Sequence, residues 1–228
     1  MTLFFQRSAM RPRQLAAGFL LVLSVLVPAH ASRLMAFRGI LHIERNQQLA
    51  QVAVGTVFRE GDTLVVEPDG EALVRFRDGA NMVLRSDSRV SFDQLVQAGP
   101  QKSRKKTLKI LKGGMRYVSG RAARQSKVAF VTQTATIGIR GTDIEIAVSE
   151  DTSSANPSGT YLKVNTGQAS LVGRDGTQVD VDPGEVAFGS EPELTPRGIG
   201  GVRRPAARRI EGASNAIFKA GALDSLLR

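Results

Sequence analysis

Side chains able to act as nucleophiles, general bases or metal ligands are scarce in this chain. Its 228 residues include no cysteine and two histidines, so thiolate chemistry is excluded and imidazole chemistry depends on His30 and His42. His42 alternates with Leu41 and Ile43, which predicts a position on the outer face of the first strand. One histidine without a neighbouring ligand is a poor metal site. We therefore expect no catalytic residue, no metal and no cofactor.

Basic residues are the main chemical feature of the sequence. The formal net charge is +10, and the chain has no acidic residue between Asp93 and Asp143. Such a run can contact an anionic partner, or it can form a solvated surface. Nucleic acid is not expected as a partner, because the run has almost no aromatic residues on which bases could stack. The candidate binding residues are Arg140, Lys105, Lys106, Lys109, Lys112, Arg116, Arg121 and Arg124.

Aspartates beside glycine or threonine form a second group of polar residues. Carboxylates at such positions usually accept hydrogen bonds from the amides of a turn, so we expect structural roles rather than a catalytic carboxylate pair. The residues of this structural group are Gly61, Asp62, Asp78, Gly79, Gly141, Thr142, Asp143 and Asp175.

The parity of the apolar residues changes at Arg140-Gly141-Thr142. Isoleucines before this point are odd-numbered, whereas the apolar residues 144, 146 and 148 after it are even-numbered. One inserted residue restores a common inward face, so we predict a β-bulge or a sharp corner with Gly141 at the bend. Arg140 would point out of the bend. There it either contacts an anionic partner or, as we favour, donates to backbone carbonyls and pairs with Asp143.

Short alternating strands between glycine-containing turns extend over most of the chain. Residues 71–77 alternate apolar and polar side chains between two Asp-Gly turns, which is a strong hairpin signal. Residues 108–118 also resemble residues 162–172, and each copy reads as a strand, a tight turn and a strand. The predicted fold is all-β, either a sandwich or a short β-solenoid of hairpin-linked strands. An N-terminal signal helix and a C-terminal helix are expected to flank it.

The first 31 residues have the features of a signal peptide. Arg7, Arg11 and Arg13 precede an apolar run over residues 15–27, and Ala29-His30-Ala31 fits cleavage after Ala31. The run is shorter than a membrane-spanning helix requires, and an uncleaved anchor is the alternative. In both cases we expect residues 32 onward to be delivered to the periplasm, with no transmembrane span in the mature chain.

Composition divides the chain into four parts. The signal peptide (1–31) is followed by a β domain (32–190), a linker rich in proline and glycine (191–205) and a basic, amphipathic tail (206–228). Apolar residues of the tail recur at spacings of three or four, which predicts a helix over residues 206–227. A partly disordered tail is the alternative.

The string Ile-Arg-Gly-Thr-Asp at residues 139–143, which follows a Thr-x-Thr-Ala strand, resembles the signature of FecR-type domains. Further landmarks occur in the order of that family, and the resemblance covers residues 37–189. They are residues 57–64, 69–72, 76–79, 88–90, 111–114 and 183–185.

The resemblance implies a periplasmic β domain that works by binding. FecR-type sensors relay the occupancy of an outer-membrane iron-siderophore receptor to a cytoplasmic sigma factor. This chain departs from that pattern, because only about 14 residues precede the apolar run and leave no room for an anti-sigma segment. A free-standing envelope protein with a FecR-type domain is therefore expected.

Two classes of function remain open. The first is a binding or signalling module whose partner is another envelope protein. The second is a structural or anionic-polymer-binding protein that docks through its basic surface onto glycans or lipid head groups. Binding of the second kind collapses as salt increases, whereas a specific protein complex is largely salt-tolerant.

Overall fold

The computed structural model describes residues 32–95, 104–120, 126–150, 156–192, 204–211, 217–218 and 220–227. The predicted signal segment, residues 1–31, lies outside the described residues. All described strands join one hydrogen-bonded arrangement of 14 strands, and the helical element beside them is a short 3₁₀ helix, η2 (Ala222–Leu227). Within these ranges, no helix has the length and apolar character needed to cross a membrane.

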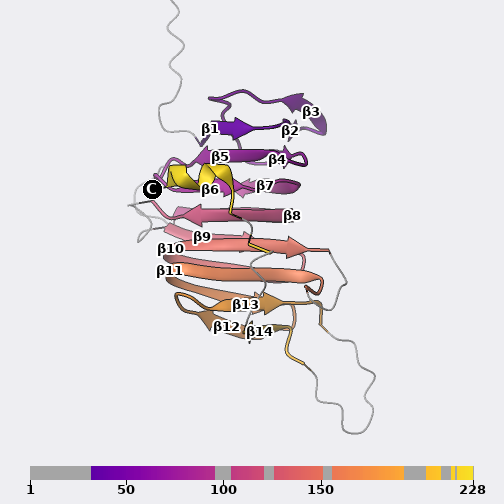
Figure 1. Ribbon diagram of the computed structural model, residues 1–228, viewed down its shortest axis with the longest axis vertical. Helices are drawn as coiled ribbons and strands as arrows, with labels where there is room; N and C mark the ends of the chain where they lie inside the picture. The colour runs from indigo at the N-terminus through magenta and orange to yellow at the C-terminus, as the bar shows by residue number, and fades with distance from the viewer. Residues whose placement is uncertain are drawn as a thin grey trace, which may run out of the picture.

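The strands form two layers, and within each layer they follow one another along the long axis of the molecule (Figure 1). The first sheet has the order β3 (Gln48–Gln51), β2 (Leu41–Arg45), β4 (Thr63–Val66), β7 (Ser88–Gln94), β8 (Arg104–Val118), β9 (Ser126–Val131), β10 (Ala135–Ser149), β11 (Gly159–Gly173) and β12 (Gln178–Val181). The second sheet has the order β1 (Arg33–Arg38), β5 (Glu71–Arg75), β6 (Asn81–Leu84), β8, β10, β11, β13 (Val186–Gly189) and β14 (Ala207–Ile210).

The long strands β8, β10 and β11 belong to both sheets, because each bends from one layer into the other. β10 pairs with β9 before its bend and with β8 after it, and its register with β11 shifts between Arg140 and Asp143. Gly141 at this bend has a φ of 64°, which confirms the predicted bulge. β8 and β11 bend at Gly113 and Gly167, with φ of 80° and 83°. These two glycines occupy the same position of the sequence repeat, so each copy is one bent strand rather than a hairpin.

A single apolar core lies between the two layers and confirms the predicted all-β fold. Alternate residues of both sheets contribute to it, as the period-two pattern requires. Aromatic rings line its upper half: Phe58 and Phe92 stack with centroids 4.7 Å apart, and Phe76, Tyr117 and Phe130 continue the row. The arrangement combines the packed layers of a sandwich with strands that wrap from layer to layer, as in a solenoid.

The helix predicted over residues 206–227 is not what the structure shows. Residues 207–210 form the strand β14, which pairs with β13, and among the described residues of this segment the helical part is η2. Asp175 explains the difference, because its carboxylate accepts hydrogen bonds from the amides of Ala206 and Thr177, each at 3.0 Å. Long-range pairing therefore prevails over a weak helical spacing. β14 thus joins the sheet within residues 206–228, which had been predicted as a separate tail, and most of the predicted linker (191–205) lies outside the described residues.

The two glycines at the shared corner of β10 and β11 differ in the space around them. A Cβ at Gly141 would have no atom within 4 Å, whereas a Cβ at Gly167 would overlap the carbonyl oxygen of Gly141. We expect Gly141→Ala to lower the free energy of unfolding by about 1 kcal/mol, the cost of the left-handed backbone alone. Gly167→Ala should lose at least about twice as much. Urea unfolding of both variants measures this, and equal losses would contradict it.

The hydrogen bonds to Asp175, first from Ala206 and then from Thr177, lower the pKa of its carboxyl from 3.8 to about 2. A depressed carboxyl pKa contributes stability that is complete above the unfolded-state pKa and is lost as the pH falls through the folded-state value. We expect wild type to exceed Asp175→Asn in stability above pH 4, with the difference shrinking between pH 4 and pH 2. Unfolding curves across this range measure it. A difference that does not depend on pH would disprove the assignment.

Candidate functional site

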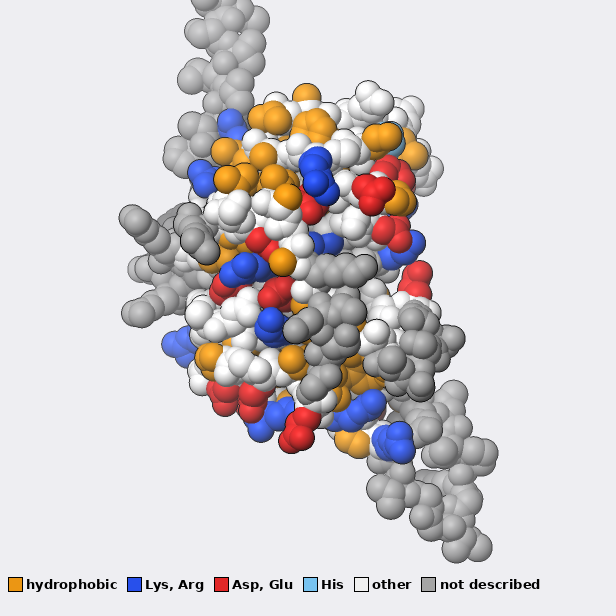
Figure 2. All heavy atoms as spheres, viewed as in Figure 1, with side chains coloured by type: hydrophobic (Ala, Val, Ile, Leu, Met, Phe, Trp, Pro, Cys, Tyr) orange, Lys and Arg blue, Asp and Glu red, His pale blue; other side chains and the backbone are white. Residues whose placement is uncertain are grey.

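Four of the six predicted basic residues that the structure describes pair with an acidic side chain. Lys109 pairs with Asp93 at 2.6 Å and Lys112 pairs with Asp87 at 2.8 Å. Arg116 pairs with Asp143 at 2.6 Å. Arg121 and Arg124 lie outside the described residues. On the face shown in Figure 2, basic and acidic side chains are interspersed, and hydrophobic side chains gather at the end of the stack near β1. The described part of the run therefore does not form one continuous basic surface.

Lys106, predicted as a binding residue, is part of the core. Its side chain is 1% exposed and pairs with Asp78 at 2.7 Å. Its ammonium group also donates a hydrogen bond to Tyr117 Oη at 2.9 Å and lies 4.0 Å from the centre of the Phe76 ring. Burial lowers the pKa of Lys106, although the Asp78 carboxylate acts in the opposite direction. Lys106 shares the parity of the inward-facing residues 108 and 110, and this signal was present in the sequence.

The turn aspartates hold backbone amides, as expected of carboxylates in turns. Asp62 accepts the amide of Arg59 at 2.7 Å and two hydrogen bonds from Arg45, and Asp78 accepts the amide of Ala80 at 3.1 Å. Gly61 and Gly79 both have positive φ in these turns.

Asp143 does not pair with Arg140, contrary to the sequence-based expectation. Its carboxylate accepts two hydrogen bonds from Arg116, at 2.9 and 2.6 Å, because the strand after the bend lies beside β8. Thr142, between them, is buried. Its amide donates to Ser119 Oγ at 3.0 Å, and its carbonyl oxygen accepts the amide of Ser119 at 2.9 Å. The bend therefore turns Arg140 and Asp143 toward different surroundings.

Arg140 lies in a groove on the outer surface of the first sheet. The groove has a volume of about 810 Å³ and is formed by β8, β9, β10, β11 and β12. Lys105 pairs with Lys127 in the register of β8 and β9, and Val128 pairs with Ile139, so Lys127 and Arg140 are also neighbours. Three exposed cations therefore form one row across three strands. Among the described residues, no hydrogen bond or ion pair involves the side chain of any of these three.

The rest of the groove combines small and apolar residues with two carboxylates. Gly138 and Ser170 lie on the rung next to the cations, and Asp180 of β12 and Asp182, which follows β12, form the other wall. Like charges on adjacent strands destabilise a sheet unless something compensates them. A carboxylate or phosphate of a partner would do so through charge-assisted hydrogen bonds. The structure brings together two predicted residues, Lys105 and Arg140, and adds Lys127, whose outward parity beside Val128 was readable from the sequence.

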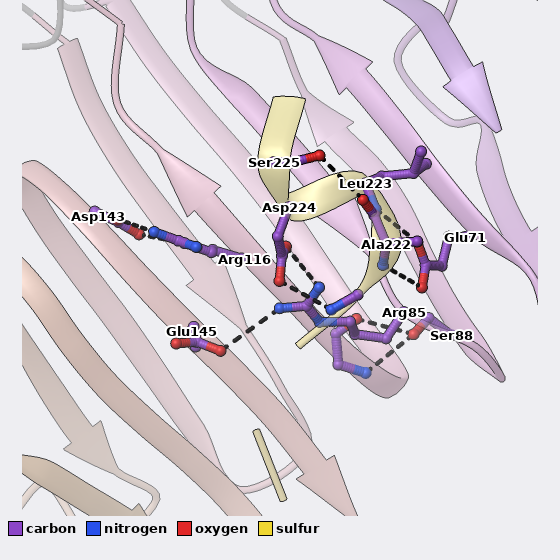
Figure 3. A network of polar contacts seen from close by, with 12 residues as sticks. Glu71, Arg85, Ser88, Arg116, Asp143, Glu145, Ala222, Leu223, Asp224 and Ser225 are labelled. Atoms are coloured by element: carbon purple, nitrogen blue, oxygen red, sulfur yellow. Dashed lines mark hydrogen bonds and ion pairs between the residues drawn. The ribbon is translucent and has the colours of Figure 1, made fainter. Parts of the chain in front are cut away.

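A second polar cluster was not predicted at all. Glu71, Arg85 and Asp224 connect the second sheet to η2 (Figure 3). Asp224 is 139 residues from Arg85 in the sequence, and no local pattern joins residues so far apart.

Known proteins resemble this chain in the following respects. The family model described as FecR protein matches residues 62–169. Two crystal structures of a protein proposed to be an anti-sigma factor, from Parabacteroides distasonis ATCC 8503, are similar to this chain, with 14% sequence identity and a TM-score of 0.45. Each alignment covers 63% of this chain and 60% of that protein, so this chain spans less than two thirds of its length. No curated protein sequence matches the chain.

The buried pair of Lys106 and Asp78 can be tested by removing one charge or both. Asp78→Asn leaves a buried ammonium group without its counter-ion, and we expect a loss of about 3 kcal/mol in the free energy of unfolding. Adding Lys106→Met removes that charge at similar volume and should restore most of the loss. Urea unfolding of the single and double variants measures the difference. A double variant no more stable than Asp78→Asn would contradict a paired charge in the core.

Proposed function

The chain is a FecR-domain protein, with the family model matching residues 62–169, and on that premise we propose that it is a non-catalytic periplasmic binding module of a signalling system. It engages an acidic segment of another envelope protein in the groove formed by β8–β12. FecR domains act in regulation, and the segment before residue 32 has the charge and hydropathy pattern of an export signal. Both features support a role in the cell envelope.

The row formed by Lys105, Lys127 and Arg140 is the observation that carries this proposal. These three side chains are exposed and converge on one groove, whereas Lys109, Lys112 and Arg116 already have acidic partners. Assembling three like charges on adjacent strands costs stability. A structural role would require an acidic partner of the kind those other residues have. The uncompensated charge is instead available to a ligand.

Docking onto an anionic polymer is less well supported. It requires a broad cationic surface, so that many weak contacts add along the polymer. Ion pairing within the sheets removes Lys109, Lys112 and Arg116 from such a surface, and burial removes Lys106. Of the described cations in the run, Lys105, Lys127 and Arg140 remain, and they occupy a groove of limited size, which suits a short acidic segment better than an extended chain.

The groove can be tested with a fluorescent oligo-glutamate peptide as the probe. We expect the variant Lys105→Ala/Lys127→Ala/Arg140→Ala to bind it at least tenfold more weakly than wild type, equal to about 1.4 kcal/mol. The matched control is Arg38→Ala/Arg59→Ala/Arg77→Ala, which removes three exposed cations outside the groove.

Fluorescence anisotropy gives a dissociation constant for each of the three proteins at low and at moderate salt. The control should bind like wild type at both salt concentrations. If the control loses as much affinity as the groove variant, binding follows net charge and the groove has no specific role. If neither variant loses affinity, the groove does not bind acidic segments.

A further inference from the structure

The C-terminal segment, residues 221–227, covers an apolar area on the outer face of the second sheet. η2 contacts β5 and β6, in front of which it lies in Figure 1. Leu73 of β5 and Val83 of β6 point outward, because their neighbours in each strand belong to the core between the layers. They are 4% and 0% exposed, and they pack with Leu223 and Leu227 of the segment.

Two charged residues of the same face hold the segment at defined atoms (Figure 3). The Glu71 carboxylate accepts the amides of Ala222 and Leu223 at 3.0 and 2.9 Å. Arg85 Nη1 donates to Asp224 Oδ1 at 2.6 Å. We call the surface formed by Glu71, Leu73, Val83 and Arg85 the clasp face. It presents a hydrogen-bond acceptor, an apolar surface and a cation to the short 3₁₀ helix η2.

The segment does not use everything that the clasp face offers. Arg85 Nη2 is buried without a hydrogen bond and forms an ion pair with Glu145 Oε2 at 3.5 Å. It lines an adjoining pocket of about 500 Å³, together with Gly114 and Ile217. A buried donor left without an acceptor costs free energy. A ligand with a further acceptor at this point would therefore fit better than the chain's own segment.

The attachment of the segment is also light. It is a six-residue 3₁₀ helix, a conformation with poorer hydrogen-bond geometry than an α-helix, and it contacts the clasp face through Leu223 and Leu227. Elements held by few buried contacts open at a smaller free-energy cost than the whole fold. No residue of the segment belongs to the core between the two layers, so we expect the sheets to stay intact when it leaves.

We propose that the clasp face is a docking site for a short acidic, leucine-bearing segment of a partner protein, and that residues 221–227 occupy this site until the partner displaces them. The partner's acidic residue takes the place of Asp224 on Arg85, and its leucines take the places of Leu223 and Leu227. This site is separate from the groove that binds acidic segments, because the groove lies on the first sheet and the clasp face on the second. Neither proposal depends on the other.

A labelled peptide with the sequence of residues 220–228 tests exchange on the full-length chain. The variant Asp224→Ala/Leu227→Ala loses the ion pair and the buried leucine of its own segment, so that segment no longer competes at the high effective concentration of a tethered ligand. We expect the peptide to bind this variant at least about tenfold more tightly than it binds wild type. Adding Arg85→Ala to the same variant should abolish the gain.

Controls separate exchange from loss of folding. Ser225→Ala/Leu226→Ala changes exposed residues of the same segment and should bind the peptide like wild type, and thermal unfolding verifies that all variants keep their fold. Equal peptide affinity for wild type and for Asp224→Ala/Leu227→Ala would overturn the proposal. A wild-type dimer in ultracentrifugation that is lost in Asp224→Ala/Leu227→Ala would also overturn it, because the occupant would then be a second copy of this chain.

Discussion

The bends of β8, β10 and β11 are the constraint on which the rest of the structure depends. Each strand contributes to both sheets, and each must present an apolar face to the shared core on both sides of its bend. Because side chains alternate strictly along a strand, the inward face is lost unless the backbone gains a residue or reverses its course at the bend. Glycines with positive φ at positions 113, 141 and 167 allow this. The two sheets are therefore continuous in their hydrogen bonding and enclose a single core.

Much of this fold could be predicted because its determinants are local. Alternation of period two, Asp-Gly turns and the change of parity at residues 140–142 each involve only a few neighbouring residues. The C-terminal region was predicted wrongly for the opposite reason. β14 forms because Asp175 and Thr177, about thirty residues away, accept hydrogen bonds from the amides of Ala206 and Ala207. The spacing of apolar residues within the region contains no information about that interaction.

The candidate site was only partly predictable, because a charge on a strand has a meaning that depends on the neighbouring strand. A run of lysines and arginines looks like a basic surface in the sequence. In the sheet, Asp93 lies near Lys109 and Asp87 near Lys112, and parity turns Lys106 into the core. What remains is a row of three cations that spans Lys105, Lys127 and Arg140. The sequence supplied their outward direction, but the pairing of β8, β9 and β10 made them neighbours.

The string at residues 139–143 has a separate physical role at each position. Ile139 packs against the core, Arg140 belongs to the groove on the first sheet, and Gly141 makes the bend. Thr142 is buried against Ser119, and Asp143 then binds Arg116 on the second sheet. A shift of one residue would turn the side chains of Arg140 and Asp143 to the opposite faces of their sheets, away from the groove and from Arg116. This short segment therefore fixes the register between the layers, and with it the positions of the groove and of the strands beside the clasp face.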